Sequence, residues 1–94
     1  AMESANSLIL IENDRVRITK WHFLPNQSTG SHIHEFDYVV VPTKSGTLNV
    51  IENLTVNESE LFLNQPYYRS KGITHEITYT GSDYMEFIEI EIKK

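Results

Sequence analysis

Two histidines stand two positions apart in this chain, and a third follows later. His32 and His34 lie in the stretch GSHIHEFDY, and His75 lies in the stretch KGITHEI. Residues i and i+2 of a β-strand point to the same face, so His32 and His34 can present two imidazoles to one ion. Neutral imidazole is the commonest side-chain metal ligand near neutral pH. Three converging imidazoles would bind a divalent metal ion (iron, manganese, nickel, copper or zinc) and leave coordination positions open for water or a substrate.

Other routes to catalysis are missing from the sequence. There is no cysteine, and there is no Gly-x-Ser-x-Gly segment that would place a nucleophilic serine on a sharp turn. The fourth histidine, His22, lies among large alternating residues in TKWHF, a setting typical of a structural or surface histidine. We therefore expect any reaction of this protein to centre on a metal ion.

Composition limits the class of protein and its partners. The chain has 94 residues, of which 39% are hydrophobic and 22% charged, as in a soluble globular domain. We expect a single domain over residues 1–94, with residues 1–7 forming a flexible N-terminus that begins with a remnant of cloning. The formal net charge is −5 at pH 7, which argues against nucleic acid and anionic membrane surfaces as partners, because both attract basic patches.

The start of the chain and its apolar runs bear on location. The first residues, AMESANSLIL, lack the basic segment and the small-residue cleavage site of a secretory signal. No apolar run approaches the ~20 residues that a membrane-spanning helix needs. Together with the absence of cysteine, these features favour a cytoplasmic protein.

The elements that position the histidines are expected to be strands. Short runs rich in β-branched and aromatic residues alternate with turn residues, and no segment keeps a helical period. We expect extended segments within residues 7–14, 15–25, 31–46, 47–53, 74–81 and 83–94. Residues 54–64 are expected to form two short strands around Asn57 and Glu58, and residues 65–72 to be irregular. This spacing indicates an antiparallel sandwich or barrel.

The last expected strand has the cleanest alternation. Ile88, Ile90 and Ile92 share one face, and Glu89 and Glu91 share the other. An antiparallel strand with one buried face carries apolar residues inward and polar residues outward. We therefore expect the isoleucines to fill the core and the glutamates to face solvent.

The histidine spacing resembles that of the cupins. Their first motif reads G-x5-H-x-H-x3,4-E-x6-G, and their second reads G-x5-P-x-G-x2-H-x3-N. The residues of this chain that stand at or near motif positions are Asn26, His32, His34, Gly46, Asn64, Ser70, Gly72, His75 and Tyr79. The resemblance covers roughly residues 16–92, and it implies an all-β fold, the double-stranded β-helix (jelly-roll) barrel of cupins.

Two departures from the motifs concern turns. Asn26 and Asn64 stand where the family has glycine. After glycine, asparagine best tolerates a left-handed backbone, so a tight turn is expected to survive both changes.

A third departure concerns the fourth metal ligand. The family pattern has a glutamate four or five residues after the second histidine, where this chain has Tyr38 and Val39. Tyr38 can bind as phenolate only if the metal helps to remove its proton, because the unperturbed pKa is ~10. Asp37 is the nearest carboxylate. The alternatives are three histidines with water, three histidines with Tyr38 or Asp37, and a degenerate cupin that binds no metal tightly.

A more local resemblance concerns the segments HIHEFDYVVVP, KGITHEI and FIEIEIK. They are similar to a subgroup of single-domain bacterial cupins, some of which are associated with β-alanine catabolism. This resemblance implies a place in amine or amino-acid metabolism, and it supplies no reaction.

A barrel of this size is expected to enclose a small ligand pocket. The proposed wall residues are Trp21, Phe23, Tyr68, Tyr79 and Phe87, with Val40 and Tyr67 as further candidates. Either Arg17 or Arg69 can hold a substrate carboxylate through a bidentate contact.

Three functions fit these features. The first is a metal-dependent enzyme that acts on a small polar metabolite. The second is a small-molecule-binding or sensing cupin without turnover, and the third is an interaction subunit. A small sheet-rich domain has strand edges to cover, so we expect a homodimer in each case, with the SLILIE segment crossing to the partner.

Overall fold

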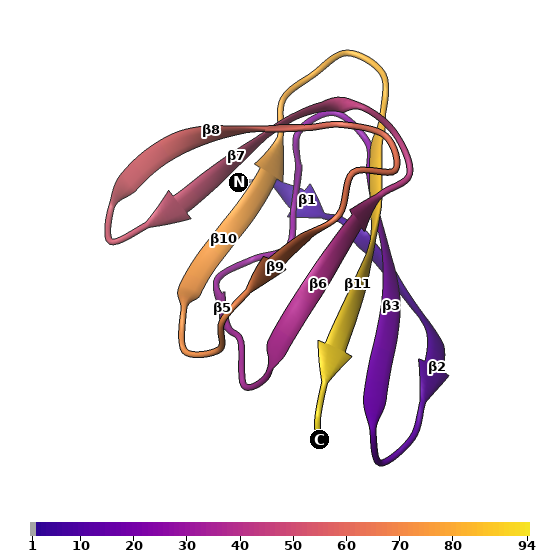
Figure 1. Ribbon diagram of the computed structural model, residues 1–94. Coiled ribbons are helices and arrows are strands. Elements are labelled where there is room, and N and C mark those ends of the chain that lie inside the picture. The colour runs from indigo at the N-terminus through magenta and orange to yellow at the C-terminus, as the bar shows by residue number, and fades with distance from the viewer. Residues whose placement is uncertain (1) are drawn as a thin grey trace.

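The computed structural model describes residues 2–94, and their strands form two facing sheets (Figure 1). The first sheet, here called the β10 sheet, has the order β1 (Glu3–Ser4), β4 (Gln27–Ser28), β10 (Thr74–Tyr79), β7 (Gly46–Glu52) and β8 (Thr55–Leu61), and β5 (His32–Ile33) also pairs with β10. The second, the β11 sheet, has the order β2 (Asn6–Glu12), β3 (Val16–Phe23), β11 (Met85–Ile92), β6 (Asp37–Pro42) and β9 (Tyr67–Arg69).

The pairings confirm the expected all-β class. Every pair of neighbouring strands is antiparallel except β1 and β4, which run parallel. Within residues 2–94 no helix is long and apolar enough to cross a membrane.

The core lies between the two sheets and follows the period of two that strands impose. In β6, for example, Tyr38, Val40 and Pro42 are buried, and the residues between them are only half-buried. The buried apolar set is Phe23, Tyr38, Val40, Leu48, Leu61, Ile77, Tyr79, Met85 and Phe87. Burying such a side chain contributes about 1.5–3 kcal/mol, so this set is the main source of stability.

The facing of β11 is opposite to the sequence expectation. Glu89 and Glu91 are buried, each with 8% of its surface exposed, while Ile88 and Ile90 are only half-buried. Ile92 is exposed.

The cause lies on the outer face of the β11 sheet, which is apolar as well. Ile90 pairs there with Ile18 on one side and Val39 on the other. Ile88 pairs with Val41 in the same way. When both faces of a strand carry apolar residues, alternation alone does not tell which face is inside.

Three smaller expectations also differ from the structure. Residues 55–61 form one strand, β8, and the chain turns before it at Asn53 and Leu54, which have φ of 49° and 65°. The segment expected to be irregular contains β9.

The expected flexible N-terminus contains β1 and the start of β2. The backbone N–H of Ala5 donates to the Ser28 carbonyl at 2.8 Å, so this segment is tied to the β10 sheet. Ala1 lies outside the described residues.

Candidate metal centre

Three histidines meet where β5 pairs with the start of β10. His32 on β5 lies opposite His75 on β10 in the antiparallel register. His34 follows β5, and its backbone N–H donates to the Ile73 carbonyl at 3.0 Å. The Gly72 N–H donates in turn to the His34 carbonyl at 2.8 Å. These backbone bonds fix the segment that carries His34 beside the turn that leads to His75.

Left-handed turns support both segments. Gly72 has φ of 98° and Gly30 has φ of 72°, values that favour glycine. Asn26 and Asn64 have φ of 63° and 60°. The prediction that asparagine replaces glycine there in a left-handed turn is confirmed.

The three side chains converge on one point. The Nε2 atom of His34 lies 3.1 Å from Nε2 of His32 and 2.8 Å from Nε2 of His75. One ligand nitrogen from each of the three side chains can be chosen so that all lie within 4.8 Å of one another. Two nitrogens bound to one ion at about 2.1 Å lie about 3.0 Å apart when their bonds meet at a right angle. The two Nε2 distances therefore fit ligands of a single ion.

The protonation of these rings also suits a metal. Nδ1 of His32 lies 3.0 Å from the Gly30 carbonyl oxygen, which can only accept, so in the neutral ring Nδ1 carries the proton and Nε2 has the lone pair that a metal needs. Burial lowers the pKa of His34 to about 4 and that of His75 to about 4, and the neighbouring imidazoles add to the effect. His34 and His75 are thus neutral at physiological pH, which is the form that binds metal.

Tyr38 lies against this cluster with its ring. It stacks on His34 with 3.9 Å between the ring centroids and 19° between the planes. Burial raises the pKa of the Tyr38 hydroxyl, and the Glu89 carboxylate adds to this, so the phenol is neutral. Stacking gives Tyr38 a role in orienting His34, whether or not its oxygen binds.

Asp37 is not brought to the cluster. It alternates with Tyr38 on β6 and accepts hydrogen bonds from the Tyr68 hydroxyl and the Lys71 backbone N–H. These bonds lower the pKa of Asp37, with the larger effect from Tyr68. The carboxylate is thereby held between β6 and β9, away from the three histidines.

A cavity of about 40 Å³ lies inside the barrel next to the histidines. A cavity of about 10–15 Å³ is enough to hold one water molecule, so the space is small. Its walls include His32, His75 and Tyr38, together with Trp21 and Phe87 from the expected wall set. Further wall residues are Thr29, Val40, Leu48, Val50, Ser59, Leu61, Tyr67, Ile77 and Glu89.

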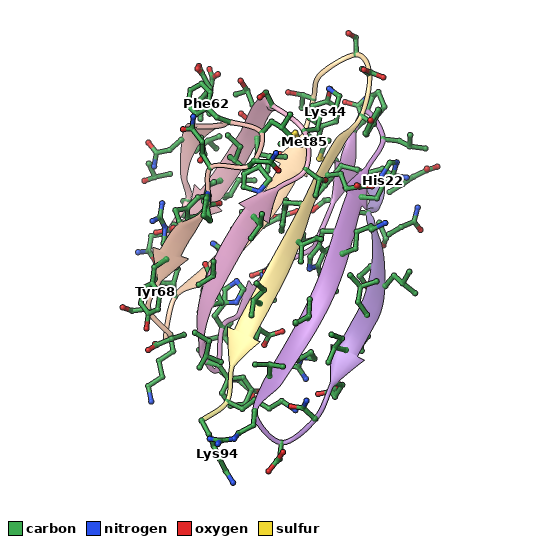
Figure 2. All side chains as sticks on the ribbon, turned by 45° about the vertical axis from the view of Figure 1, so that its right-hand side comes forward. His22, Lys44, Phe62, Tyr68, Met85 and Lys94 are labelled. Carbon is green, nitrogen blue, oxygen red and sulfur yellow. The ribbon has the colours of Figure 1, made fainter. Side chains whose placement is uncertain are left out.

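The other expected wall residues lie elsewhere. Tyr68 is 53% exposed and lies at the rim of the molecule (Figure 2), and its neighbour Tyr67 faces the cavity instead. Phe23 is packed in the core against Phe87, with ring centroids 5.7 Å apart. Tyr79 is buried and its hydroxyl accepts from the Asp83 N–H.

A wider recess of about 230 Å³ adjoins the histidines on the β3 side, and we call it the mouth. The mouth shares Trp21, Thr29, His32 and Glu89 with the inner cavity. Arg17, a proposed carboxylate anchor, also lines the mouth.

The two arginines have partners of their own. Arg17 makes a bidentate ion pair with Glu91, with distances of 2.9 and 2.8 Å. Arg69 lies over the Tyr67 ring, 4.5 Å from its centroid.

His22 lies apart from the cluster, as expected. Its Nδ1 is 2.9 Å from a Glu86 carboxylate oxygen, and its ring stacks on Tyr84. Figure 2 shows His22 on the strand next to β11, near the end of the molecule that also carries Met85.

Sequence reasoning missed Glu89 and Glu91, because it assigned them to the solvent face. One signal in the sequence could have found them. Met85 and Phe87 share their parity in the strand, and these are large residues that seek burial.

Comparison with known proteins gives consistent results. No family model matches the chain. The β-alanine degradation protein BauB of Pseudomonas aeruginosa is 35% identical over 85 residues, which cover 90% of each chain. A crystal structure of a cupin domain from Bordetella pertussis is 35% identical with a TM-score of 0.96, and the match covers 100% of this chain and 98% of the other.

More distant structures share the fold alone. The polyketide cyclase RemF of Streptomyces resistomycificus superposes with a TM-score of 0.74 at 17% identity, over 99% of this chain and 70% of that one. The expected double-stranded β-helix barrel is thus confirmed. The chain belongs to the cupins, and it shares a family with the β-alanine degradation protein BauB.

Proposed function

We propose that this cupin is a metal-dependent enzyme that acts on a small polar metabolite in amine or amino-acid catabolism. The observation that carries the proposal is the convergence of three imidazoles, from His32, His34 and His75, beside a small internal cavity. The name of the relative BauB, a β-alanine degradation protein, supports the metabolic setting.

The donor set fits a first-row divalent metal ion, because all three donors are imidazole nitrogens and His34 and His75 are held neutral. His32, His34 and His75 would hold the ion. When bound, such an ion supplies a Lewis acid that polarises an oxygen group or activates water.

The remaining residues serve binding and orientation. Tyr38 fixes the His34 ring by stacking. Trp21 and Phe87 line the cavity with apolar surface that excludes water from the ligand. The mouth, where Arg17 lies, provides one way in from solvent. A second recess of about 260 Å³, where Arg69 lies, adjoins the inner cavity at Tyr38 and His75 and provides another.

Turnover can be tested directly. Metal-loaded protein is incubated with a panel of small amines and amino acids, and the mixtures are followed by NMR. The proposal expects one compound to be converted, and expects metal-free protein and the His75→Ala variant to be inactive. Equal conversion by loaded and metal-free protein would contradict a metal-dependent reaction.

The alternative is a cupin that binds a small molecule without turning it over. The small volume of the inner cavity, about 40 Å³, favours this alternative for a ligand of only a few atoms. Ligand binding in the same panel without any conversion would select it.

The homodimer remains part of the proposal. β2 forms one edge of the β11 sheet and exposes Leu8, Ile9, Leu10 and Ile11. An exposed apolar edge is a ready place for a second copy to pair, and a two-fold axis would match the strand with itself. A cytoplasmic location and the lack of nucleic-acid and membrane partners stay predictions from the sequence.

A further inference from the structure

Glu89 has an unusual position for a carboxylate. It lies in the middle of the inner face of the β11 sheet, between Thr19 on β3 and Val40 on β6. Along β11 its inward neighbours are Phe87 and Glu91. Only 8% of its surface is exposed. A buried carboxylate of this kind is costly unless something compensates its charge.

Glu89 faces the space where a ligand would bind. It lines both the inner cavity and the mouth, as Trp21, Thr29 and His32 also do. The inner cavity adds three more aromatic rings, those of Tyr38, Tyr67 and Phe87. Glu89 is therefore a carboxylate at the boundary between an inner cavity with largely aromatic and apolar walls and a mouth lined mostly by polar residues.

Within residues 2–94, no cation makes a direct contact with Glu89. Among residues 2–94, Arg17 is the basic residue on the neighbouring strand that faces the mouth, and both of its paired nitrogens bind Glu91. No ion pair within the described part of the chain involves Glu89. Burial raises the pKa of Glu89 to about 7, the Glu91 carboxylate adds to this, and the charge of Arg17 opposes it without a direct contact.

We propose that Glu89 binds the ammonium group of a small amine, with the indole of Trp21 and the ring of Phe87 forming the walls around it. A carboxylate supplies the charge and the hydrogen-bond acceptors that an ammonium group needs. Aromatic faces attract the same cation, and tryptophan does so most strongly. The inner cavity of about 40 Å³ and the mouth of about 230 Å³ suit a short molecule.

This inference deepens the proposed function, and it rests on that function for the other end of the ligand. The titratable groups that line the inner cavity and the mouth besides Glu89 are Glu91, Arg17, Tyr38, Tyr67 and the three histidines. A further recess of about 260 Å³ beside His75 adds Arg69, Glu52 and Glu58. An ion on the histidines would repel the ammonium group and attract an oxygen donor. The ligand class is therefore a short molecule with an amine at one end and a carboxylate or carbonyl at the other.

Calorimetric titration of metal-free protein tests the amine site without relying on the metal. The probes are propylamine, which carries only the amine, propionate, which carries only the carboxylate, and β-alanine, which carries both. We expect propylamine to bind at least ten times more tightly than propionate. The Glu89→Gln variant should lose at least tenfold in propylamine affinity, whereas propionate binding should not weaken.

The matched control is Glu86→Gln, on the same strand but on the opposite face, where Glu86 contacts His22 and Thr43. It should bind propylamine like the wild type. Trp21→Leu, which removes the ring from the wall, should weaken propylamine binding and serves as a second test if Glu89→Gln does not fold. Because the amine arrives protonated, binding near pH 7 should also release protons from Glu89, and buffers of different ionisation enthalpy measure this release.

The outcomes separate this inference from the proposed function. Propylamine binding that depends on Glu89 in a protein that never retains metal would uphold the amine site and reject the metal-dependent enzyme. Propylamine that binds no better than propionate would overturn the amine site, whatever the metal content. If folded Glu89→Gln protein keeps its propylamine affinity, the amine site is overturned as well. If Glu89→Gln does not fold, undiminished propylamine affinity of Trp21→Leu protein has the same meaning.

Discussion

His32 and His34 are each oriented by a specific neighbour. The Gly30 carbonyl sets the tautomer of His32, and the face of Tyr38 packs on the ring of His34. Such supporting contacts hold ligands in place before a metal arrives, which lowers the cost of binding. Variants of Tyr38 and Asp37 can then show whether these residues bind the metal or only support the histidines.

We predict that Tyr38→Phe and Asp37→Asn both retain metal at the wild-type stoichiometry. Phenylalanine keeps the ring that stacks on His34, and Asp37 is bound by Tyr68 and Lys71 instead of facing the histidines. Metal content measured by elemental analysis checks this. A loss of metal in Tyr38→Phe protein would identify the hydroxyl as the fourth ligand, and a loss in Asp37→Asn protein would assign that place to the carboxylate.

Glu89 should make stability depend on pH. Its pKa is about 7 in the folded protein and has an ordinary value of 4.5. Folding therefore favours the protonated form, and this contribution is fully present below pH 4.5 and is lost as the pH rises through 7. A rise of this size corresponds to about 3 kcal/mol. The wild type should therefore lose up to about 3 kcal/mol of its free energy of unfolding between pH ~5 and ~8, and the Glu89→Gln variant should not show this loss.

Urea denaturation of metal-free protein at both pH values measures this difference. Glu86→Gln is again the control, because the His22 contact lowers the pKa of Glu86 and its carboxylate stays ionised over the whole range. An equal difference between wild type and Glu89→Gln at the two pH values would show that Glu89 is not buried as described.

At the scale of elements, the site depends on how β5 and β10 meet. The turn at Gly72 holds the end of β5 beside the start of β10. The Gly72 N–H donates a hydrogen bond to the His34 carbonyl, and the chain enters β10 two residues later. At φ of 98° only glycine avoids backbone strain, although a Cβ at residue 72 would meet no atom within 4 Å. The constraint is thus one of backbone conformation and not of space.

We predict that Gly72→Ala lowers the free energy of unfolding by about 1–3 kcal/mol and weakens metal binding, because relief of the strained backbone shifts His34 and His75. Asn64→Gly is the matched control, since it keeps a left-handed residue at φ of 60°. It should lower the free energy of unfolding by less than about 1 kcal/mol, through the greater entropy that glycine gives the unfolded chain. Urea denaturation and titration against a competing chelator measure the two effects, and wild-type values for Gly72→Ala would contradict this account of the turn.

The strands also show which features the sequence could predict. The resemblance to the cupin motifs predicted the barrel and the meeting of His32, His34 and His75. Short-range strand geometry alone predicts only that His32 and His34 share a face, because His75 lies 41 residues after His34. β11 was harder, since its alternation of glutamate and isoleucine fits either facing. The pairing of Ile90 with Ile18 and Val39, which is long-range, reveals a second apolar face. In the sequence, the shared parity of Met85 and Phe87 is the one signal for the buried face.

The cavity walls were harder for the same reason. A shift of one residue exchanges the two faces of a strand, so a sequence cannot place Tyr67 inside and Tyr68 outside without knowledge of the register. The register of β9 comes from its pairing with β6, where Tyr68 lies opposite Val39. Glu89 was missed through the same ambiguity in β11.

At the scale of the whole molecule, the outer face of the β11 sheet and the exposed edge at β2 form one apolar surface. Ile11 on β2 pairs with Ile18 on β3, which pairs in turn with Ile90 on β11. Contiguous exposed apolar surface of this kind marks an interaction site. Isologous pairing of two copies is the simplest way to cover it.

We predict that the wild-type protein has twice the mass of a single chain in solution and that Ile11→Lys has the mass of one chain. A lysine in this surface places a charge where the two copies meet. Leu54→Lys is the control, because Leu54 is 99% exposed in the turn between β7 and β8 and lies outside the surface. Light scattering during size-exclusion chromatography measures the masses, and a wild-type monomer would contradict the dimer.

The whole barrel serves to bring three imidazoles to one point beside a cavity, and that claim has a direct test. The measurement is elemental analysis of protein purified without a histidine tag or chelator, beside His32→Ala, His34→Ala, His75→Ala and, as a control, His22→Ala. We expect about one equivalent of a first-row divalent metal in the wild type and in His22→Ala, and its loss in the other three. No metal in folded wild type after re-addition, or metal retained in all three variants, would contradict it.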